Sequence, residues 1–267
     1  MKINIGIIGG SGFYKFLENP QKLNIKTPYG KTSDSIFTGN LFNKKVAFLP
    51  RHGLKHHLAP HKIPYRANIW ALKKIGVNKI ISVSAAGSLQ EKIKPGNFVI
   101  CEDYIDFTRG ARKDTFFENN DVRHILQINP YCASLNEQVR KVLKFYKLPF
   151  HNHGTIVVIN GPRFSTPAES KICQNWGGSI INMTQYPEII LANELGICYA
   201  NISLVTDYDA WVEKSNIKLL KSSNAKDIIK TFAQNIEKLK MILLKIIRDL
   251  DIKPCKICQE KAKKAKI

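Results

Sequence analysis

Apolar residues along the chain follow two kinds of spacing: short continuous runs that are typical of strands, and repeats of three and four residues that are typical of helices. The apolar runs predict strands at residues 3–8, 46–50, 79–83, 96–100, 154–159, 180–181 and 198–205. Helical spacing predicts helices at residues 65–75, 134–147, 187–195 and 224–250, and a further helix after residue 166. Alternating strands and helices are the pattern of an α/β fold.

The stretch from Ile180 to Asp209 is the most informative part of the chain. It is predicted to form a strand, a loop, a helix that ends at Gly196, and a second strand apolar enough to be covered on both faces. The second strand ends in Thr206-Asp207-Tyr208-Asp209. Residues two apart in an extended chain point to the same side, so Asp207 and Asp209 can converge on one ligand, and open α/β folds place their sites at such strand ends. A polar turn that contains two acids is the alternative.

Three other predicted strands end in residues that suit an anion. The first runs into Gly9-Gly10-Ser11-Gly12, whose backbone N–H groups and Ser11 hydroxyl can donate to an anion. Arg51-His52-Gly53 and Ser84-Ala85-Ala86-Gly87-Ser88 follow two more strands. The glycine-rich loop matches neither the dinucleotide fingerprint nor a P-loop. A tight turn and a surface loop are the alternatives for these segments.

A helix start is predicted at Thr166, with Pro167 at the first helical position and Glu169 completing a capping box. Phe164 lies just before this cap, on a loop that the cap should fix, where its ring can stack on a planar ligand. A place in the core is the alternative for a single aromatic residue.

The composition is that of a globular protein, with 44% of the 267 residues hydrophobic and 23% charged. The chain shows no repeat and no linker, so we expect one domain over residues 1–250 and a short basic tail over 251–267. The N-terminal glycines argue against a signal peptide, and we expect a cytoplasmic protein with no membrane partner. The formal charge of +20 suggests a nucleic-acid-binding protein, but the lysines are scattered and no nucleic-acid motif accompanies them.

Neither the cysteines nor the histidines predict a metal site. Six cysteines are spread along the chain, as is typical of buried thiols. Cys255 and Cys258 form a C-x-x-C that is compatible with half of a zinc site or with a reversible disulfide, but no second cysteine or histidine pair follows it. The histidine pairs 52/56 and 57/61 have helical spacing, yet Gly53 and Pro60 make a continuous helix improbable there. We therefore expect no metal.

Six motifs in register resemble the trimeric purine nucleoside phosphorylase family, and within it the branch that acts on 5'-methylthioadenosine. They are Ile7-Ile8-Gly9-Gly10-Ser11-Gly12, Arg51-His52-Gly53, Ser84-Ala85-Ala86-Gly87-Ser88-Leu89, Gly161-Pro162-Arg163-Phe164-Ser165, Asn182-Met183-Thr184 and Thr206-Asp207-Tyr208-Asp209. The resemblance covers roughly residues 3–250. It implies a single-domain α/β fold with a mixed, curved central β-sheet flanked by helices, a homotrimer, and an active site near the subunit interface.

The resemblance also implies roles for individual residues. Phosphate would bind to Ser11, Arg51, His52, Ser84, Ala85 and Thr184. The nucleoside would contact Ala86, Gly87, Phe164, Met183, Asp207, Asp209, His56 and, from a neighbouring subunit, His124. Asp207 and Asp209 would be the catalytic residues, Ser165 would mark adenine specificity, and Ala225 would lie in the methylthio pocket.

These residues agree with the activity that the resemblance implies, which is phosphorolysis of S-methyl-5'-thioadenosine to adenine and 5-methylthioribose 1-phosphate, a pentosyl transfer in purine and methionine salvage. The reaction needs an oriented phosphate, which is a co-substrate, and a proton donor for the departing base, but no cofactor. Two adjacent buried carboxylates keep one of the pair protonated near neutral pH.

The same pair of carboxylates predicts the substrate class. An ionised carboxylate accepts a hydrogen bond from an exocyclic amino group and repels a 6-oxo group, so we expect 6-aminopurine nucleosides. A purine nucleoside phosphorylase of broader or 6-oxopurine specificity is the alternative. A basic nucleic-acid-binding protein is less favoured.

Overall fold

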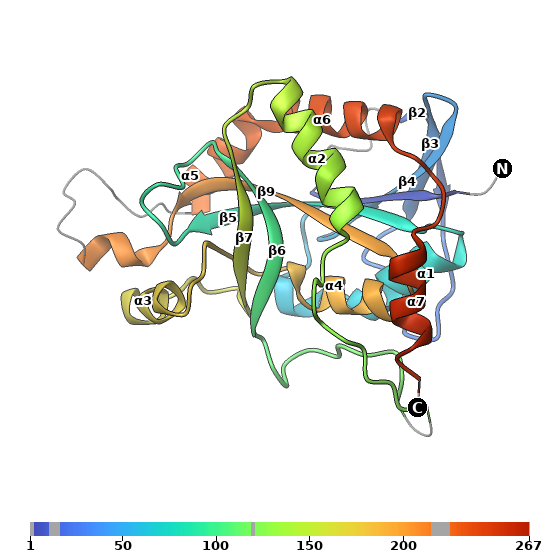
Figure 1. Ribbon diagram of the computed structural model, residues 1–267, viewed down its shortest axis with the longest axis horizontal. Coiled ribbons are helices and arrows are strands. Elements are labelled where there is room, and N and C mark those ends of the chain that lie inside the picture. The colour runs from blue at the N-terminus through green and yellow to red at the C-terminus, as the bar shows by residue number, and fades with distance from the viewer. Residues whose placement is uncertain (1–2, 11–16, 119–120, 215–224, 267) are drawn as a thin grey trace.

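The computed structural model describes residues 3–10, 17–118, 121–214 and 225–266 (Figure 1). Within these residues, nine strands form one sheet in the order β2-β3-β4-β1-β5-β8-β7-β6-β9. The strands are β1 (Ile5–Gly9), β2 (Glu18–Leu23), β3 (Ile36–Leu41), β4 (Lys44–Pro50), β5 (Lys79–Ser88), β6 (Phe98–Phe107), β7 (Phe150–Ile159), β8 (Ile180–Asn182) and β9 (Cys198–Tyr208).

Strand β5 organises the sheet because it pairs with three other strands. It is parallel to β1 over residues 79–82, parallel to β9 along its whole length, and antiparallel to β8 at Gly87 and Ser88. The pairs β8–β7, β7–β6 and β6–β9 then close these five strands into a ring. The sheet is therefore mixed and strongly curved, as predicted, and Figure 1 shows β6 and β7 crossing in front of β5 and β9.

Helices cover both faces of this sheet. They are α1 (Tyr65–Lys74), α2 (Ala133–Phe145), α3 (Pro167–Asn175), α4 (Gln185–Glu194), α5 (Ala225–Gln234), α6 (Ile236–Asp249) and α7 (Lys256–Lys263), with the short 3-10 helices η2 (Pro60–Lys62) and η3 (Ala210–Lys214). Val139 of α2 and Leu243 of α6 belong to the apolar core on one face, and Ile69 of α1 and Leu191 of α4 belong to the core on the other. No helix of the described residues is long and apolar enough to span a membrane.

The single helix predicted over residues 224–250 is wrong, because the structure contains two helices, α5 and α6, separated at Asn235. Asn235 leaves the helical conformation with φ −105° and ψ 3°. Its Nδ2 donates to the carbonyl of Thr231 at 2.9 Å, and its Oδ1 accepts from Lys238 Nζ at 3.0 Å. Asparagine competes with helical backbone bonds in this way. The apolar spacing concealed the break because it continues through both helices.

The C-terminal residues fold onto the domain. Gly196 follows α4 with φ 64°, as expected of a helix C-terminus, and a Cβ there would lie 3.3 Å from Gln259 Cα in α7. Ala262 and Ala265 are buried. Helix α7 therefore packs against the end of α4, although the domain boundary at residue 250 stays a prediction.

Candidate active site

The two acidic residues lie where β9 passes the end of β5. β9 is buried along its whole length, as predicted, and its pairing with β5 shifts by one residue so that Asp207 lies opposite Gly87. The N–H of Asp209 donates to the carbonyl of Ser88 at 2.9 Å. Both carboxylates are 7% exposed. A Cβ on Gly87 would lie 3.6 Å from Asp207 Oδ2 and 3.5 Å from Asp209 Cβ, so the glycine leaves space beside both acids.

The environment favours the protonated form of both acids. Burial raises the pKa of Asp207 to about 6; a hydrogen bond from Thr206 opposes this shift, and the nearby charge of Asp209 adds to it. Burial also raises the pKa of Asp209, against hydrogen bonds from Ser170 and Ser165. The pair therefore has the environment that the sequence predicted, and Asp209 has more groups that stabilise its ionised form.

One oxygen of Asp209 is left for a ligand. Ser165 Oγ donates to Asp209 Oδ1 at 3.4 Å. Asp209 Oδ2 is buried and has no hydrogen-bond partner among the described residues. A buried carboxylate oxygen without a partner is costly, so Oδ2 would gain from a donor of a bound molecule. Because the atom is fully buried, such a donor reaches it only when the Asp209 side chain or the groups that cover it shift.

The backbone of β5 has an open side between its two neighbours. β1 pairs with β5 as far as Ser82, and β8 begins to pair at Gly87, so residues 83–86 have β9 on one side only. The carbonyl of Val83 points to the open side, where it accepts from Arg51 Nη1 at 2.9 Å. Because residues two apart in a strand point their backbone groups the same way, the N–H of Ala85 also faces this opening.

Ser84 and Thr184 are joined near this opening by Asn182. Asn182 Nδ2 donates to Ser84 Oγ at 3.3 Å, and the N–H of Thr184 donates to Asn182 Oδ1 at 3.3 Å. Ser84 Oγ also lies 3.3 Å from Asn201 Oδ1. Two of the predicted phosphate-binding hydroxyl residues are thus brought together from β5 and from the loop after β8.

Arg51 is more deeply paired than its sequence position suggests. Its Nε donates to Glu188 at 3.0 Å, its Nη2 lies 2.9 Å from Glu188 Oε1 and donates to Ser82 Oγ at 2.5 Å, and its Nη1 donates to Val83. The side chains of Arg51 and Glu188 are 3% and 2% exposed. A guanidinium has five N–H groups, so one N–H on Nη1 is left over by these contacts in the described residues. Glu188 was not singled out from the sequence because a lone acid in an apolar helix carries no motif.

His52 has a defined tautomer. Its Nδ1 lies 2.8 Å from the carbonyl of Leu58, which can only accept, so Nδ1 carries the hydrogen and Nε2 is an acceptor while the ring is neutral. Burial lowers the pKa of His52 to about 4; the Leu58 bond opposes this shift, whereas Arg51 and His56 add to it. His56 is exposed and stacks on His52, with ring centroids 4.4 Å apart. The sequence placed His52 in a segment that suits an anion, whereas the free nitrogen of the neutral ring is an acceptor.

Phe164 is carried by the loop that the sequence predicted to be fixed. The capping box of α3 is present, with Thr166 Oγ1 accepting from the N–H of Glu169 at 3.2 Å and Glu169 Oε2 accepting from the N–H of Thr166 at 2.8 Å. Phe164 is 50% exposed, so it is not part of the core of this chain.

Arg112 joins the loops around Phe164 and Met183, a role that sequence reasoning missed. It donates to the carbonyls of Asn160 at 2.9 Å and Met183 at 2.8 Å, and to the carbonyl of Tyr186. A long side chain whose donors serve distant carbonyls leaves no local sequence signal.

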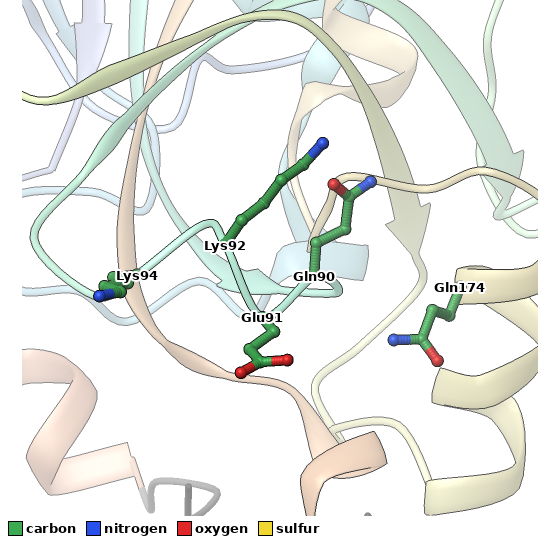
Figure 2. Close-up of a pocket in the computed structure, with 5 residues that line it drawn as sticks. All are labelled: Gln90, Glu91, Lys92, Lys94 and Gln174. Atoms are coloured by element: carbon green, nitrogen blue, oxygen red, sulfur yellow. The ribbon is translucent and has the colours of Figure 1, made fainter. Parts of the chain in front are cut away.

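Two hollows lie near this region. One, of about 300 Å³, is lined by Phe107, Ile159, Asn160, Gly161, Arg163, Ser165, Glu169, Ile172 and Cys173. It therefore includes Ser165, the partner of Asp209. The other is open and lies on the loop after β5, where Figure 2 shows Gln90, Glu91, Lys92, Lys94 and Gln174 around it. None of the predicted site residues lines this second hollow.

Three predicted residues are not placed at this site by the structure. Ser11 lies outside the described residues, and Ala225 begins α5 but its side chain is likewise outside the description. His124 is exposed, and its N–H donates to the carbonyl of Ala265 at 2.9 Å beside the C-terminus. Its predicted role belongs to a neighbouring subunit, so it stays a prediction.

Comparison with known proteins finds relatives over nearly the whole chain. Residues 4–248 match the phosphorylase superfamily. The chain is 45% identical over 248 residues to an S-methyl-5'-thioadenosine phosphorylase of Thermofilum pendens, covering 92% of each chain. It is similar in structure to a methylthioadenosine phosphorylase from an Antarctic soil metagenomic library, with a TM-score of 0.91, 38% identity, and 100% of this chain and 93% of that chain covered. It is also similar to the methylthioadenosine phosphorylase of Schistosoma mansoni in complex with adenine, with a TM-score of 0.91, 32% identity and 99% of both chains covered.

Proposed function

The chain belongs to the phosphorylase superfamily, and on that premise we propose that it is a pentosyltransferase that cleaves S-methyl-5'-thioadenosine with phosphate to adenine and 5-methylthioribose 1-phosphate. The observation that carries this proposal is the pair of buried acids, Asp207 and Asp209, at the same end of β5 as the opening beside residues 83–86. The acids suit the purine and the anion donors suit the phosphate, and these lie on the two sides of the C1'–N9 bond that breaks. The relatives named above support the choice of nucleoside.

Phosphate binds, in this proposal, at the opening beside residues 83–86. Five groups donate to it: the hydroxyls of Ser11 and Thr184, the N–H of Ala85, the spare N–H of Arg51, and the hydroxyl of Ser84, which turns from Asn201 Oδ1 to do so. Neutral His52 accepts a hydrogen bond from a phosphate that still carries a proton. Held in this way, a phosphate oxygen attacks C1' of the ribose while the bond from C1' to N9 breaks, and orienting the two reactants supplies much of the rate.

Asp207 is the proton donor in this proposal. Its raised pKa of about 6 keeps about a tenth of it protonated at pH 7 and more below that, and the Thr206 hydroxyl donates to it at 2.7 Å. As the bond to N9 breaks, the electron pair moves into the purine ring, and the proton of Asp207 passes to N7 of the base. Asp207 is left ionised and regains its proton before the next turnover.

Asp209 recognises the base. Ser165 and Ser170 stabilise its ionised form, and its unpartnered Oδ2 accepts a hydrogen bond from the 6-amino group. A 6-oxo group would face that oxygen with a second acceptor, so hypoxanthine nucleosides are disfavoured. Gly87 and Ala86 provide a flat floor for the ring, and Met183 and Phe164 cover the ribose and the base.

We propose a homotrimer in which the active site lies at an interface. Exposed apolar side chains gather beside the hollow that Ser165 lines: Phe107, Phe164, Ile172 and Trp176 are 41–58% exposed. Phe107 and Trp176 stack with ring centroids 5.0 Å apart. A contiguous exposed apolar surface is typical of an interface, and there His56 and a neighbouring subunit's His124 would border the 5' substituent. The cytoplasmic location expected from the sequence stays part of this proposal.

The function is tested by an assay of methylthioadenosine, adenosine and inosine with and without phosphate. We expect phosphate-dependent release of adenine, with methylthioadenosine the best substrate and inosine the poorest. Cleavage without phosphate would identify a nucleosidase instead, and faster release of hypoxanthine than of adenine would overturn the substrate assignment. Light scattering of the purified protein tests the trimer.

A further inference from the structure

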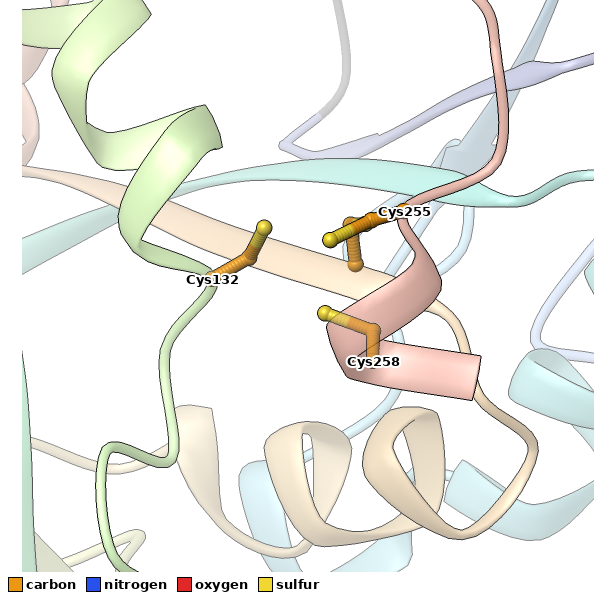
Figure 3. Close-up of side chains that lie close together, drawn as sticks. Cys132, Cys255 and Cys258 are labelled. Atoms are coloured by element: carbon orange, nitrogen blue, oxygen red, sulfur yellow. The ribbon is translucent and has the colours of Figure 1, made fainter. Parts of the chain in front are cut away.

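Four cysteines from three distant parts of the chain meet at one point. Cys132 precedes α2, Cys198 begins β9, Cys255 precedes α7, and Cys258 lies in the first turn of α7. Their sulfur atoms all lie within 4.8 Å of one another. Figure 3 shows Cys132, Cys255 and Cys258 pointing toward a common centre. All six cysteines of the chain lie in the described residues, and none of them forms a disulfide there.

We propose that these four cysteines bind one structural zinc ion. Zinc with four thiolates is tetrahedral with bonds of about 2.3 Å, which places neighbouring sulfur atoms about 3.8 Å apart. No two of the sulfur atoms of Cys132, Cys198, Cys255 and Cys258 are more than about 1 Å further apart than this arrangement requires. Four thiolates this close leave no room for the several iron and sulfide atoms of an iron–sulfur cluster. The closed set of four ligands has no open position for a substrate, so the ion is structural.

The surroundings favour negative charge at this point. Cys132 and Cys255 are the N-cap residues of α2 and α7, so the free N–H groups at the start of two helices face the cluster, as in other sites that stabilise thiolates. The buried Lys79 pairs with Cys198 across β5 and β9 and interacts with its charge. Lys261 interacts with the charge of Cys258. These cations balance the two net negative charges of a zinc ion with four thiolates.

The sequence carries no complete signal for this site. Only Cys255 and Cys258 have metal-ligand spacing, and no second pair follows them, so the sequence predicted no metal. The second pair consists of Cys132 and Cys198, 66 residues apart, which the fold brings together because α2 starts beside the first residue of β9. The N–H of Cys132 donates to the carbonyl of Tyr199 at 2.9 Å, which fixes this junction.

The site would hold the C-terminal helix α7 onto the domain. Apart from this cluster, α7 is attached through small contacts such as those at Gly196 and Ala262. The cluster lies at the beginning of β9, nine residues before Asp207, which is about 30 Å along an extended strand. Loss of the ion would therefore loosen α7 and lower stability, and would not remove a group from the active site.

The first test is the metal content of the wild-type protein, produced without a histidine tag in medium that contains zinc. We expect about one zinc per chain by mass spectrometry of the elements, and X-ray absorption with four sulfur neighbours at about 2.3 Å. Replacement by Co²⁺ should give the intense sulfur-to-metal absorption of a tetrahedral thiolate site. Two results would overturn the proposal. One is a protein that contains no zinc and whose intact mass is lower by two hydrogens per disulfide, because the cysteines are then oxidised to disulfides. The other is one iron per chain in place of zinc.

The second test compares two variants. Cys255→Ser/Cys258→Ser should lower the zinc content at least about tenfold, whereas the matched control Cys101→Ser, a buried cysteine outside the cluster, should retain it. A strong chelator should lower the melting temperature of the wild type and of the control by about 5 °C or more, and should not affect the double variant. Equal zinc content in the double variant and the control would contradict the site. Should the double variant fail to fold, the wild-type metal content still decides, and neither measurement depends on the proposed activity.

Discussion

Arg51 and Glu188 form an ion pair beneath the opening in β5, with Nη2 and Oε1 2.9 Å apart and both side chains almost fully buried. The arginine thus has two roles that the sequence could not separate. It holds the carbonyl of Val83 and the hydroxyl of Ser82 in place, and in the proposed site its remaining N–H donates to phosphate. In the proposed phosphate site the charge of Arg51 is largely balanced by Glu188, so we expect most of the affinity for phosphate to come from hydrogen-bond geometry.

Removing only one partner of this pair should destabilise the protein strongly. Glu188→Ala leaves a buried guanidinium without a counter-charge, and we expect the free energy of unfolding to fall by about 3–5 kcal/mol. The double variant Arg51→Met/Glu188→Leu should recover most of that loss, yet its KM for phosphate should rise while its KM for the nucleoside changes little. Urea unfolding and initial-rate kinetics measure both effects. A cost below about 1 kcal/mol for Glu188→Ala would contradict the importance of the pair.

Asp207→Asn should lose most of the activity. An amide in place of the acid cannot give its proton to N7, and general acid catalysis typically supplies a factor of about 10²–10⁴, so we expect kcat/KM for methylthioadenosine to fall by that amount. The exposed Asp103, whose Oδ1 accepts from the N–H of Tyr104, provides the control variant Asp103→Asn. An unchanged kcat/KM in Asp207→Asn would remove this residue from the mechanism.

The same substitution should stabilise the folded protein at alkaline pH. The pKa of Asp207 is raised in the folded state from an ordinary 3.8 to about 6, so folding binds a proton more tightly and stability falls as pH rises through about 6. The difference of about two units corresponds to roughly 3 kcal/mol. A neutral amide carries no such cost, so Asp207→Asn should unfold at higher urea concentration than the wild type at pH 8, and the difference should disappear below about pH 4. Equal pH dependence in the two proteins would show that the carboxylate is not desolvated.

The sequence was sufficient for most elements of the fold because their apolar patterns are local. β9, α4 and the capping box of α3 follow directly from residues within one element. The break at Asn235 was missed because the apolar stripe is the same on either side of it. β2 and β3 were missed because the polar sequence of β2 and the mixed sequence of β3 carry no continuous apolar run.

The candidate site was predictable only where it consists of short motifs at strand ends. Asp207 and Ser84 could be identified in this way, whereas Thr184 was predicted only from the family resemblance, and all three lie near the end of β5. Glu188 acts through a contact with Arg51, which lies 137 positions earlier in the sequence, and Arg112 contacts residues up to 74 positions later. The sequence around Glu188 and Arg112 gives no sign of these partners. The tautomer of His52 depends on the Leu58 carbonyl, which only a loop conformation can supply.

Gly87→Ala should weaken binding of the nucleoside and leave phosphate binding nearly unchanged. The added methyl group would lie 3.3 Å from Ile181 Cγ2 and about as close to both acids, where the base is proposed to bind. The backbone can accept alanine there, because Gly87 is not among the glycines with positive φ. We expect the KM for methylthioadenosine to rise about tenfold or more, equivalent to about 1.4 kcal/mol, with a small change in melting temperature. A large loss of stability with an unchanged KM would mean that Gly87 is required for packing and not for the base.

His52 should remain neutral in the phosphate-free enzyme and change when phosphate binds. Burial holds its pKa at about 4, and the Leu58 carbonyl keeps the hydrogen on Nδ1, so ¹⁵N spectra should show this single neutral tautomer from pH 6 to pH 8. A phosphate anion beside Nε2 favours the protonated ring, and an opposite charge at contact raises a pKa by about 1–3 units. By linkage, the His52 contribution should make phosphate bind more tightly as pH falls from the raised pKa of the complex to about 4. His52→Asn removes the titrating ring, so it should abolish this pH dependence. The ¹⁵N signals that disappear in this variant are those of His52. A midpoint near 6.5 without phosphate, or no shift on its addition, would show that the ring does not face the anion.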